Sequence, residues 1–243
     1  MIAELNRDIF ESNMKRLLIA VILIELYFIF LSLNDYFSLQ PGIEETQIYI
    51  GIFATFENFD RRGAQRETWL LSSRFKHKFL IDKWTPEWKE ENKKYGDIIS
   101  LNSSFTGYAT GFGEKLYRWF EYAGKNFPKG SLVGKSDDDF YACSNLYDVV
   151  LENQHPRMYF GWWHFLQDKR ELKNPSKKVR VDSQFVVIGW KLLKEVIEKP
   201  YCHPAVEREG CTLENPEVRY DTNSGGSSLG TWLGHIGNVH GVK

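Results

Sequence analysis

The chain has 243 residues, 42% of them hydrophobic and 15% aromatic, which suffices for one sizeable core and excludes a disordered chain. Its 31 Lys and Arg residues balance 32 Asp and Glu residues, so it lacks the positive field that a nucleic-acid partner requires. Three cysteines without a C-x-x-C pair exclude a disulfide-built scaffold and a zinc or thioredoxin-like motif.

An apolar segment over residues 17–33 lies near the start and contains one charged residue, Glu25. Its Leu, Ile, Val and Phe residues contribute about −6 kcal/mol to membrane insertion, against about +3 kcal/mol for the acid. The segment therefore predicts a transmembrane signal anchor. A cleaved signal peptide is the alternative, disfavoured because no A-x-A-like site follows. Lys15 and Arg16 predict a cytosolic tail over 1–16 and a lumenal chain after about Asn34.

After a polar stem over 34–46, strands and helices alternate through a lumenal domain that spans 47–243. The predicted strands are 47–55, 77–81, 97–100, 131–135 and 183–188. The predicted helices are 61–71, 86–94, 114–122, 144–151, 191–198 and a last one that opens at 223–228. This alternation predicts an α/β fold with a mostly parallel central sheet. Residues 167–178 are predicted to form a charged loop.

A lumenal location would permit two covalent modifications. Asn102 begins an Asn-Ser-Ser tripeptide, which is an acceptor for a glycan in the secretory pathway. Cys202 and Cys211 are close enough in sequence to form a disulfide in an oxidising lumen, which leaves Cys143 unpaired. The alternative is that all three are ordinary buried thiols.

Three consecutive acids, Asp137, Asp138 and Asp139 (the acidic triplet), follow the strand predicted over 131–135. Ligands of open α/β sheets bind beyond the carboxyl ends of strands. The first and third acids can face one way and offer hard oxygens to Mn²⁺ or Mg²⁺, with diphosphate oxygens completing the shell. A solvated turn or the N-cap of the next helix is the alternative.

A segment rich in arginine follows the first strand. Arg62, Arg66 and Trp69 recur at helical spacings of four and three residues, so they share one helix face. A guanidinium there can contact a phosphate or stack on a base. The alternative is a charged surface helix with Trp69 in the core.

Four motifs in this order carry a resemblance to a known family: Phe-Asp-Arg-Arg at 59–62, Arg-Glu-Thr-Trp at 66–69, Tyr-Gly-Asp-Ile-Ile at 95–99 and Lys-Ser-Asp-Asp-Asp-Phe at 135–140. Together they resemble glycosyltransferase family 31, which contains β-1,3-galactosyltransferases, β-1,3-N-acetylglucosaminyltransferases and the fringe relatives. The resemblance covers about residues 48–233. It implies a GT-A-type fold, a UDP-sugar donor, a Mn²⁺ bridge to the diphosphate and a type II membrane protein of the Golgi.

The resemblance also implies roles for single residues. The family's E-D-V motif, with its catalytic base, best matches Tyr220-Asp221-Thr222, where an N-cap or a turn is the alternative for Asp221. The implied base is Asp221, the implied metal ligands are Asp137, Asp139 and the late His240, and the implied donor-binding residues are Thr55, Arg62, Arg66, Lys135, Asp137 and Asp138.

The expected function is that of a Golgi hexosyltransferase, which moves a sugar from a UDP-sugar to a glycan acceptor on protein or lipid with inversion and forms a β-1,3 bond. A non-catalytic, membrane-anchored lectin-like relative is the alternative, because the family's Glu is Tyr220 here and few residues follow Asp221. A metal-dependent phosphohydrolase is a third interpretation, which leaves the arginine-rich segment without an explanation.

Overall fold

The computed structural model describes Glu25, Tyr27 and residues 46–104, 111–165, 179–205, 208–222 and 225–242. The chain divides into two units, Met1–Glu45 and Thr46–Lys243. Glu25 and Tyr27 are helical, while the rest of the predicted tail, anchor and stem up to residue 45 lies outside the described residues, as does the loop predicted over 167–178. Among the described residues, no helix has the length and apolar character needed to cross a membrane.

The second unit is built on a seven-stranded sheet with the order β3-β2-β1-β4-β6-β5-β9. β6 runs antiparallel to both neighbours, and every other adjacent pair is parallel. β7 and β8 form a separate parallel pair. The strands are β1 (Ile48–Phe53), β2 (Lys76–Ile81), β3 (Ile98–Ser100), β4 (Leu132–Asp137), β5 (Met158–Phe165), β6 (Val179–Ile188), β7 (Tyr201–Cys202), β8 (Arg219–Tyr220) and β9 (His240–Val242). The predicted α/β class with a mostly parallel sheet is confirmed.

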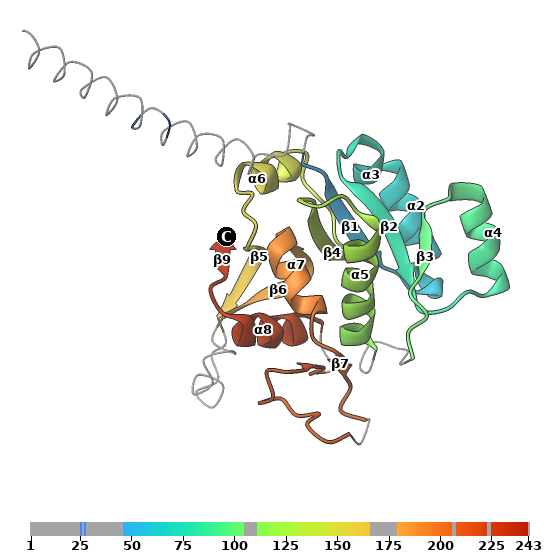
Figure 1. The fold of residues 1–243 in the computed structure, drawn as a ribbon. Coiled ribbons are helices and arrows are strands. Elements are labelled where there is room, and N and C mark those ends of the chain that lie inside the picture. Colours follow the sequence, from blue (N-terminus) through green and yellow to red (C-terminus); the bar gives the residue numbers. More distant parts are fainter. Residues whose placement is uncertain are drawn as a thin grey trace, which may run out of the picture. The chain divides into compact units, whose positions relative to one another are not determined.

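Helices cover both faces of this sheet (Figure 1). One apolar core lies between the sheet and α5, α7 and α8, and a second core lies between the sheet and α3, α4 and α6. The helical segments are η1 (Phe56–Asn58), α2 (Phe59–Glu67), α3 (Trp69–Ser72), α4 (Pro86–Tyr95), α5 (Phe112–Asn126), α6 (Leu146–Glu152), α7 (Trp190–Ile197) and α8 (Gly225–Ile236).

The apolar run of β1 explains its central position in the sheet. Ile48, Ile50 and Ile52 are fully buried in the core on one face, and a run that is apolar on both faces is typical of a strand covered on both sides. A β-carbon placed at Gly51 would lie 2.7 Å from Cε2 of Trp119. Glycine at this position therefore lets α5 pack closely on the strand.

The differences from the predicted elements are local. The helix predicted over 61–71 is interrupted at Thr68, whose backbone leaves the helical region and separates α2 from α3. The helix predicted over 86–94 is present as α4, with Pro86 in its first turn, a side-chain cap from Thr85 and a left-handed Gly96 at its end. No strand was predicted for β5, β7, β8 or β9.

Candidate functional site

The carboxyl ends of three neighbouring parallel strands form the candidate site. Phe53, the last residue of β1, pairs with Leu80 of β2 on one side and with Asp137 of β4 on the other. Thr55, Asp82 and the acidic triplet therefore follow strand ends that lie side by side. This is the edge of an open α/β sheet where ligands bind.

The acids of the triplet face different surroundings. Asp138 accepts a hydrogen bond of 2.7 Å from the Asn58 side-chain amide and lies 3.5 Å from a guanidinium nitrogen of Arg61. The Gln65 amide donates to the Asp138 carbonyl oxygen at 3.0 Å. The start of α2 thus fixes the turn that carries the triplet, while Asp139 remains exposed.

Asp137 lies on the opposite face of the sheet, where it pairs with the buried ammonium of Lys135. That ammonium lies 5.0 Å from the ring centre of Phe53 and 4.7 Å from that of Phe112. Burial raises the pKa of the Asp137 carboxyl, the Lys135 charge lowers it, and the two following acids raise it again. The balance leaves the pKa raised, with burial as the largest cause, so Asp137 lies in a partly desolvated position.

A second lysine and acid pair lies at the same edge. Asp82 directly follows β2, and one of its carboxylate oxygens lies 3.1 Å from Nζ of Lys115 in α5. The Lys115 ammonium also lies 5.6 Å from the ring centre of Phe53. Sequence reasoning missed Asp82, although an acid directly after a predicted strand was a usable signal.

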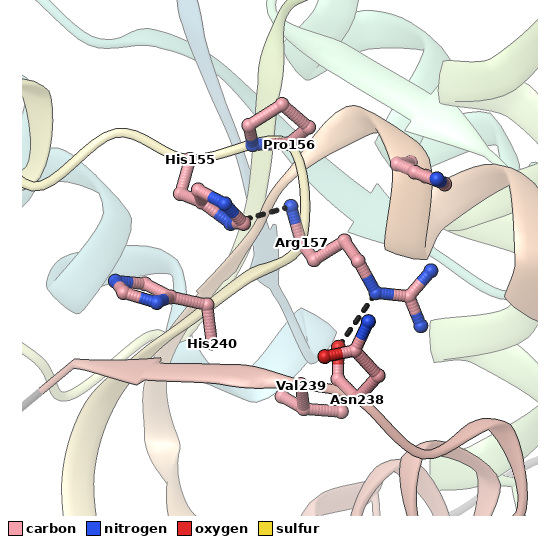
Figure 2. A pocket seen from close by; sticks show the side chains of 7 residues that line it. His155, Pro156, Arg157, Asn238, Val239 and His240 are labelled. Carbon is pink, nitrogen blue, oxygen red and sulfur yellow. Dashed lines mark hydrogen bonds between the residues drawn. The ribbon is translucent and has the colours of Figure 1, made fainter.

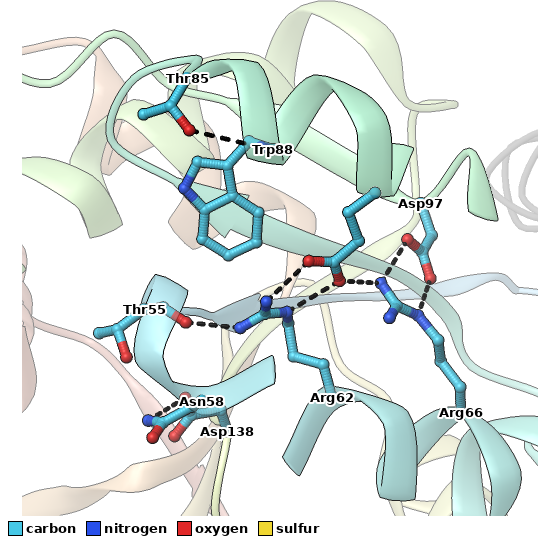
Figure 3. Close-up of polar contacts among 9 residues, drawn as sticks. Thr55, Asn58, Arg62, Arg66, Thr85, Trp88, Asp97 and Asp138 are labelled. Atoms are coloured by element: carbon cyan, nitrogen blue, oxygen red, sulfur yellow. Dashed lines mark hydrogen bonds and ion pairs between the residues drawn. The ribbon is translucent and has the colours of Figure 1, made fainter. Parts of the chain in front are cut away.

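The guanidinium of Arg62 lies in a buried network between α2 and α4 (Figure 3). Its Nε and Nη2 donate to the two carboxylate oxygens of Glu91 at 3.0 and 2.7 Å, and its Nη1 donates to the carbonyl oxygen of Thr55. Its charge lies 4.3 Å from the ring centre of Trp88. Arg62 therefore holds the backbone just after β1 through the carbonyl oxygen of Thr55.

Arg66 continues this network one helical turn later. Its Nε donates to Asp97 at 2.8 Å, and its Nη2 donates to Glu91 at 2.8 Å and to Asp97 at 2.9 Å. The guanidinium also lies 4.0 Å from the ring centre of Tyr95. Both predicted donor-binding arginines are thus engaged by partners within the fold, and Thr55 is the member of this group that lies exposed at the site.

The carboxylate of Asp221 is fully enclosed, with 0% of the residue exposed. Ser228 donates a hydrogen bond of 2.9 Å to it, the Tyr201 hydroxyl donates another, and the Asp221 backbone N–H donates to the Cys202 carbonyl at 2.8 Å. A β-carbon at Gly113 would lie 2.5 Å from its carboxyl carbon. Burial and the nearby Asp221 charge raise the pKa of Tyr201, so this phenol stays protonated as a donor.

The first turn of α5 lies between Asp221 and the lysine that pairs with the acidic triplet. Gly113 packs against Asp221, and the preceding Phe112 contacts the Lys135 ammonium that pairs with Asp137. The structure thus brings the predicted base and the predicted metal ligands to one region. The enclosure of Asp221 nevertheless leaves no surface of its carboxylate open to an acceptor hydroxyl.

His240 lies at the opposite edge of the sheet from the acidic triplet. It pairs with Met158 at the start of β5, and the strand register places it level with Leu132 at the start of β4. Asp137 is five residues further along β4, so roughly 16 Å along the strand and about 14 Å across three strand spacings separate the two residues. Since cation ligands lie about 2–2.6 Å from the ion, His240 cannot share a cation with the triplet and is left out of the site.

His240 instead lines an open pocket of about 490 Å³ (Figure 2). Its ring centre lies 4.4 Å from that of His155, whose Nδ1 accepts a hydrogen bond of 3.1 Å from the Arg157 backbone N–H. Slight burial, His240 and Arg157 lower the pKa of His155. The Arg157 guanidinium donates to the carbonyl oxygens of Gly237 and Asn238 and pairs with Glu195, so these contacts fasten β9 to the sheet.

Asn102 lies near the carboxyl edge, and the two cysteines of the predicted disulfide lie in the segment beside Asp221. Asn102 is exposed just after β3 and adopts a left-handed backbone conformation with φ of 52°. Cys202 and Cys211 form a disulfide with their Cα atoms 5.8 Å apart, and Cys143 is free and exposed. The disulfide closes the loop that begins at β7, the strand whose Cys202 carbonyl holds the backbone of Asp221.

The triplet fits a divalent cation that is shared with a ligand. In the part of the chain that the structure describes, no three His, Cys, Asp or Glu side chains converge into a metal-binding group. Asp137 and the exposed Asp139 have the hard carboxylate oxygens that such a cation takes, and both lie at one strand end. Further ligands of the cation would have to come from a bound diphosphate or water.

The model of a family described as galactosyltransferase matches residues 60–190, which is just over half of the chain. The matched region runs from the start of α2 to the start of α7 and includes the acidic triplet. A search of curated proteins gave no match.

Proposed function

The chain belongs to the galactosyltransferase family, and from this premise we propose that it transfers a hexose from a UDP-sugar to a glycan acceptor on protein or lipid. We further propose that it forms a β-1,3 bond with inversion and works in the Golgi lumen on an N-terminal membrane anchor. The family membership supports glycosyl transfer with a nucleotide-sugar donor. The motifs of family 31 and the apolar segment over 17–33 support the finer proposals.

The observation that carries the proposal is the position of the acidic triplet. It begins at Asp137, the last residue of β4, beside the ends of β1 and β2, and Thr55 is exposed just after β1. Asp137 and Asp139 would hold Mn²⁺ or Mg²⁺, which supplies positive charge to the diphosphate leaving group when bound. Lys135, held beneath Asp137, keeps that carboxylate oriented.

Arg62 and Arg66 act on the donor site as positioning residues in this proposal. Through the Thr55 carbonyl, Arg62 fixes the turn that leads from β1 into α2. Asn58 and Gln65 from the same turn and helix hold the triplet. One buried network therefore supports both strand ends that would contact the donor.

Inverting transfer also requires a base that takes the proton of the acceptor hydroxyl. Asp221 is the proposed base, since it lies beside the α5 turn that Lys135 contacts. Its enclosure means that this role requires the surrounding contacts of Tyr201 and Ser228 to open when substrates bind. The same enclosure favours a second candidate function, that of a lectin-like relative that binds the donor without turnover.

Transfer assays with the full-length protein test both candidates. UDP-galactose, UDP-N-acetylglucosamine and UDP-N-acetylgalactosamine would be incubated with Mn²⁺ and a panel of glycan acceptors, and NMR would identify the linkage and anomeric configuration of any product. Asp139→Asn should abolish Mn²⁺-dependent donor binding, while the exposed Asp148→Asn on α6 serves as the matched control. Donor binding without any product supports the lectin-like relative, and no donor binding refutes both.

Localisation needs a separate experiment. In sealed microsomes we expect residues after about Asn34 to be protected from protease and Asn102 to carry a glycan that an endoglycosidase removes. Replacement of Asn102 by Gln should remove that glycan. Cytosolic exposure of the C-terminus would contradict the proposed topology.

A further inference from the structure

Two large aromatic side chains are exposed near the acidic triplet. Tyr141 is 64% exposed and Trp162 is 78% exposed. Tyr141 lies two residues beyond Asp139, and Trp162 follows Gly161, which the sheet register places level with Lys135 of β4. Tyr141 therefore lies just beyond the carboxyl end of β4, and Trp162 lies near that level on β5, which is separated from β4 by two strand spacings, or about 10 Å.

The two positions differ in their backbone surroundings. Tyr141 lies between the partly buried Phe140, whose carbonyl accepts a hydrogen bond of 3.1 Å from Gln65, and the buried Ala142. The register between β5 and β6 shifts between Gly161 and Trp163, and such bulges redirect side chains. A hydrogen bond therefore holds the backbone beside Tyr141, whereas Trp162 lies at an irregularity of the sheet, and both side chains are exposed.

A row of packed rings joins the two positions beneath the surface. The Phe140 ring stacks on Phe185 of β6 with centres 4.9 Å apart and an angle of 17°. Phe185 meets Phe160 of β5 edge-on with centres 6.4 Å apart. Tyr141 is the residue after Phe140, and Trp162 is two residues after Phe160. Both exposed side chains therefore lie next to the same cluster of packed rings.

We propose that Tyr141 and Trp162 form a platform on which pyranose rings of the glycan acceptor stack. This inference rests on the proposed function, which requires an acceptor at this edge. The C–H face of a pyranose is apolar and suits the electron-rich face of an aromatic ring, while its hydroxyl groups can donate to nearby acids such as Asp139. An anionic lipid surface would instead select Lys and Arg, and acids lie beside Tyr141.

The platform can be tested by direct binding, without turnover. Lactose and methyl β-D-galactopyranoside would be titrated into the full-length protein and followed by saturation-transfer NMR. We expect Tyr141→Ala and Trp162→Ala each to weaken binding about threefold to tenfold. Trp162→Phe, which keeps an aromatic face, should retain most of the affinity.

The matched control is Leu71→Ala, because Leu71 is 79% exposed on α3, which leads toward the start of β2 and hence the opposite edge. It should leave glycoside binding unchanged. Wild-type protein that binds neither glycoside, or alanine variants that bind them as wild type does, would overturn the platform. So would a self-association that Trp162→Ala abolishes while glycoside binding persists, since a second copy would then be the occupant.

The affinity for UDP with Mn²⁺, measured in the same variants, separates this proposal from the proposed function. We expect it to be equal in all of them, because neither ring belongs to the proposed donor site. If the wild type binds glycosides through the platform but binds no UDP, the platform stands and the transferase proposal fails. If UDP binds and transfer occurs although the platform variants keep their acceptor KM, the platform fails alone.

Discussion

Replacement of Glu91 by Gln tests whether Arg62 and Arg66 stabilise the fold through Glu91 or are instead available to bind a ligand. The paired side chains of Arg62 and Glu91 are 0% and 4% exposed, and Glu91 also accepts from Arg66. Breaking a buried pair by neutralising one partner costs about 3–5 kcal/mol, because the other charge stays buried and uncompensated. Total stabilities of domains are only about 5–15 kcal/mol, so the variant should be severely destabilised.

Urea unfolding followed by tryptophan fluorescence measures this loss. With an m value of about 2 kcal/mol per molar urea, the midpoint should fall by about 1.5–2.5 M. The matched control is Glu217→Gln, which removes the exposed partner of Lys199, 68% accessible in its side chain. An exposed pair contributes under about 1 kcal/mol, so the control midpoint should fall by less than about 0.5 M.

The pH dependence of stability gives the same test an independent readout. Burial raises the pKa of Glu91, but hydrogen bonds from Arg62 and Arg66 outweigh it and hold the pKa below its usual range. A carboxyl with a lowered folded-state pKa stabilises the protein above its unfolded pKa, and that stabilisation is lost as the pH falls through the folded value. In the Glu91→Gln variant, the free energy of unfolding should therefore fall less steeply as the pH is lowered than it does in the wild type. If Glu91→Gln has the same urea midpoint and the same loss of stability at low pH as Glu217→Gln, the network does not support the fold.

Three further changes, one of them with a control at Gly63, probe the site itself. Gly113→Ala should destabilise the protein by about 1–3 kcal/mol in thermal melts, because a β-carbon there meets Asp221, whereas Gly63→Ala, with open space around it, should stabilise α2 by up to about 1 kcal/mol. Asp221→Asn should lower kcat by about two to four orders of magnitude with UDP affinity unchanged, and a near-normal rate would assign the base to another group. Asp139→Ala should eliminate the melting-temperature increase that Mn²⁺ with UDP gives the wild type, and an unchanged increase would show that the triplet is only a turn.

The sequence predicts the carboxyl edge well because its signals are local. The strand that leads into the acidic triplet is short and begins with the apolar Leu132 and Val133, and Pro86 and Gly96 mark the two ends of α4. Such signals lie within a few residues of the feature that they predict. Four of the strands that the structure describes have only two or three residues, and of these only β3, with its apolar Ile98 and Ile99, was predicted; β7, β8 and β9 carry no pattern that identifies a strand.

The arginines show a different limit of sequence reasoning. Helical spacing correctly places Arg62 and Arg66 on one face of a helix, but it does not say what that face contacts. Their partners Glu91 and Asp97 lie 25–31 residues away along the chain, so only the fold brings them together. A phosphate-binding arginine and an arginine in a buried ion pair look alike in sequence. His240 illustrates the same limit, since a late position in the chain does not tell at which edge of the sheet it lies.

The direction of β6 has the largest effect on the candidate site. Because β6 is antiparallel to β5, the last residue of β5, Phe165, pairs with the first residue of β6, Val179, at the same edge as the acidic triplet. A parallel β6 would need a crossover, and its first residues would then lie at the opposite edge. β5 therefore runs toward the edge of the acidic triplet, and β6 runs away from it. Because β6 is antiparallel to both neighbours, β5 runs parallel to β4 and ends at the same edge, two strand spacings from the triplet. This arrangement, which no local pattern reveals, places the exposed Trp162 toward the side where we propose that transfer takes place.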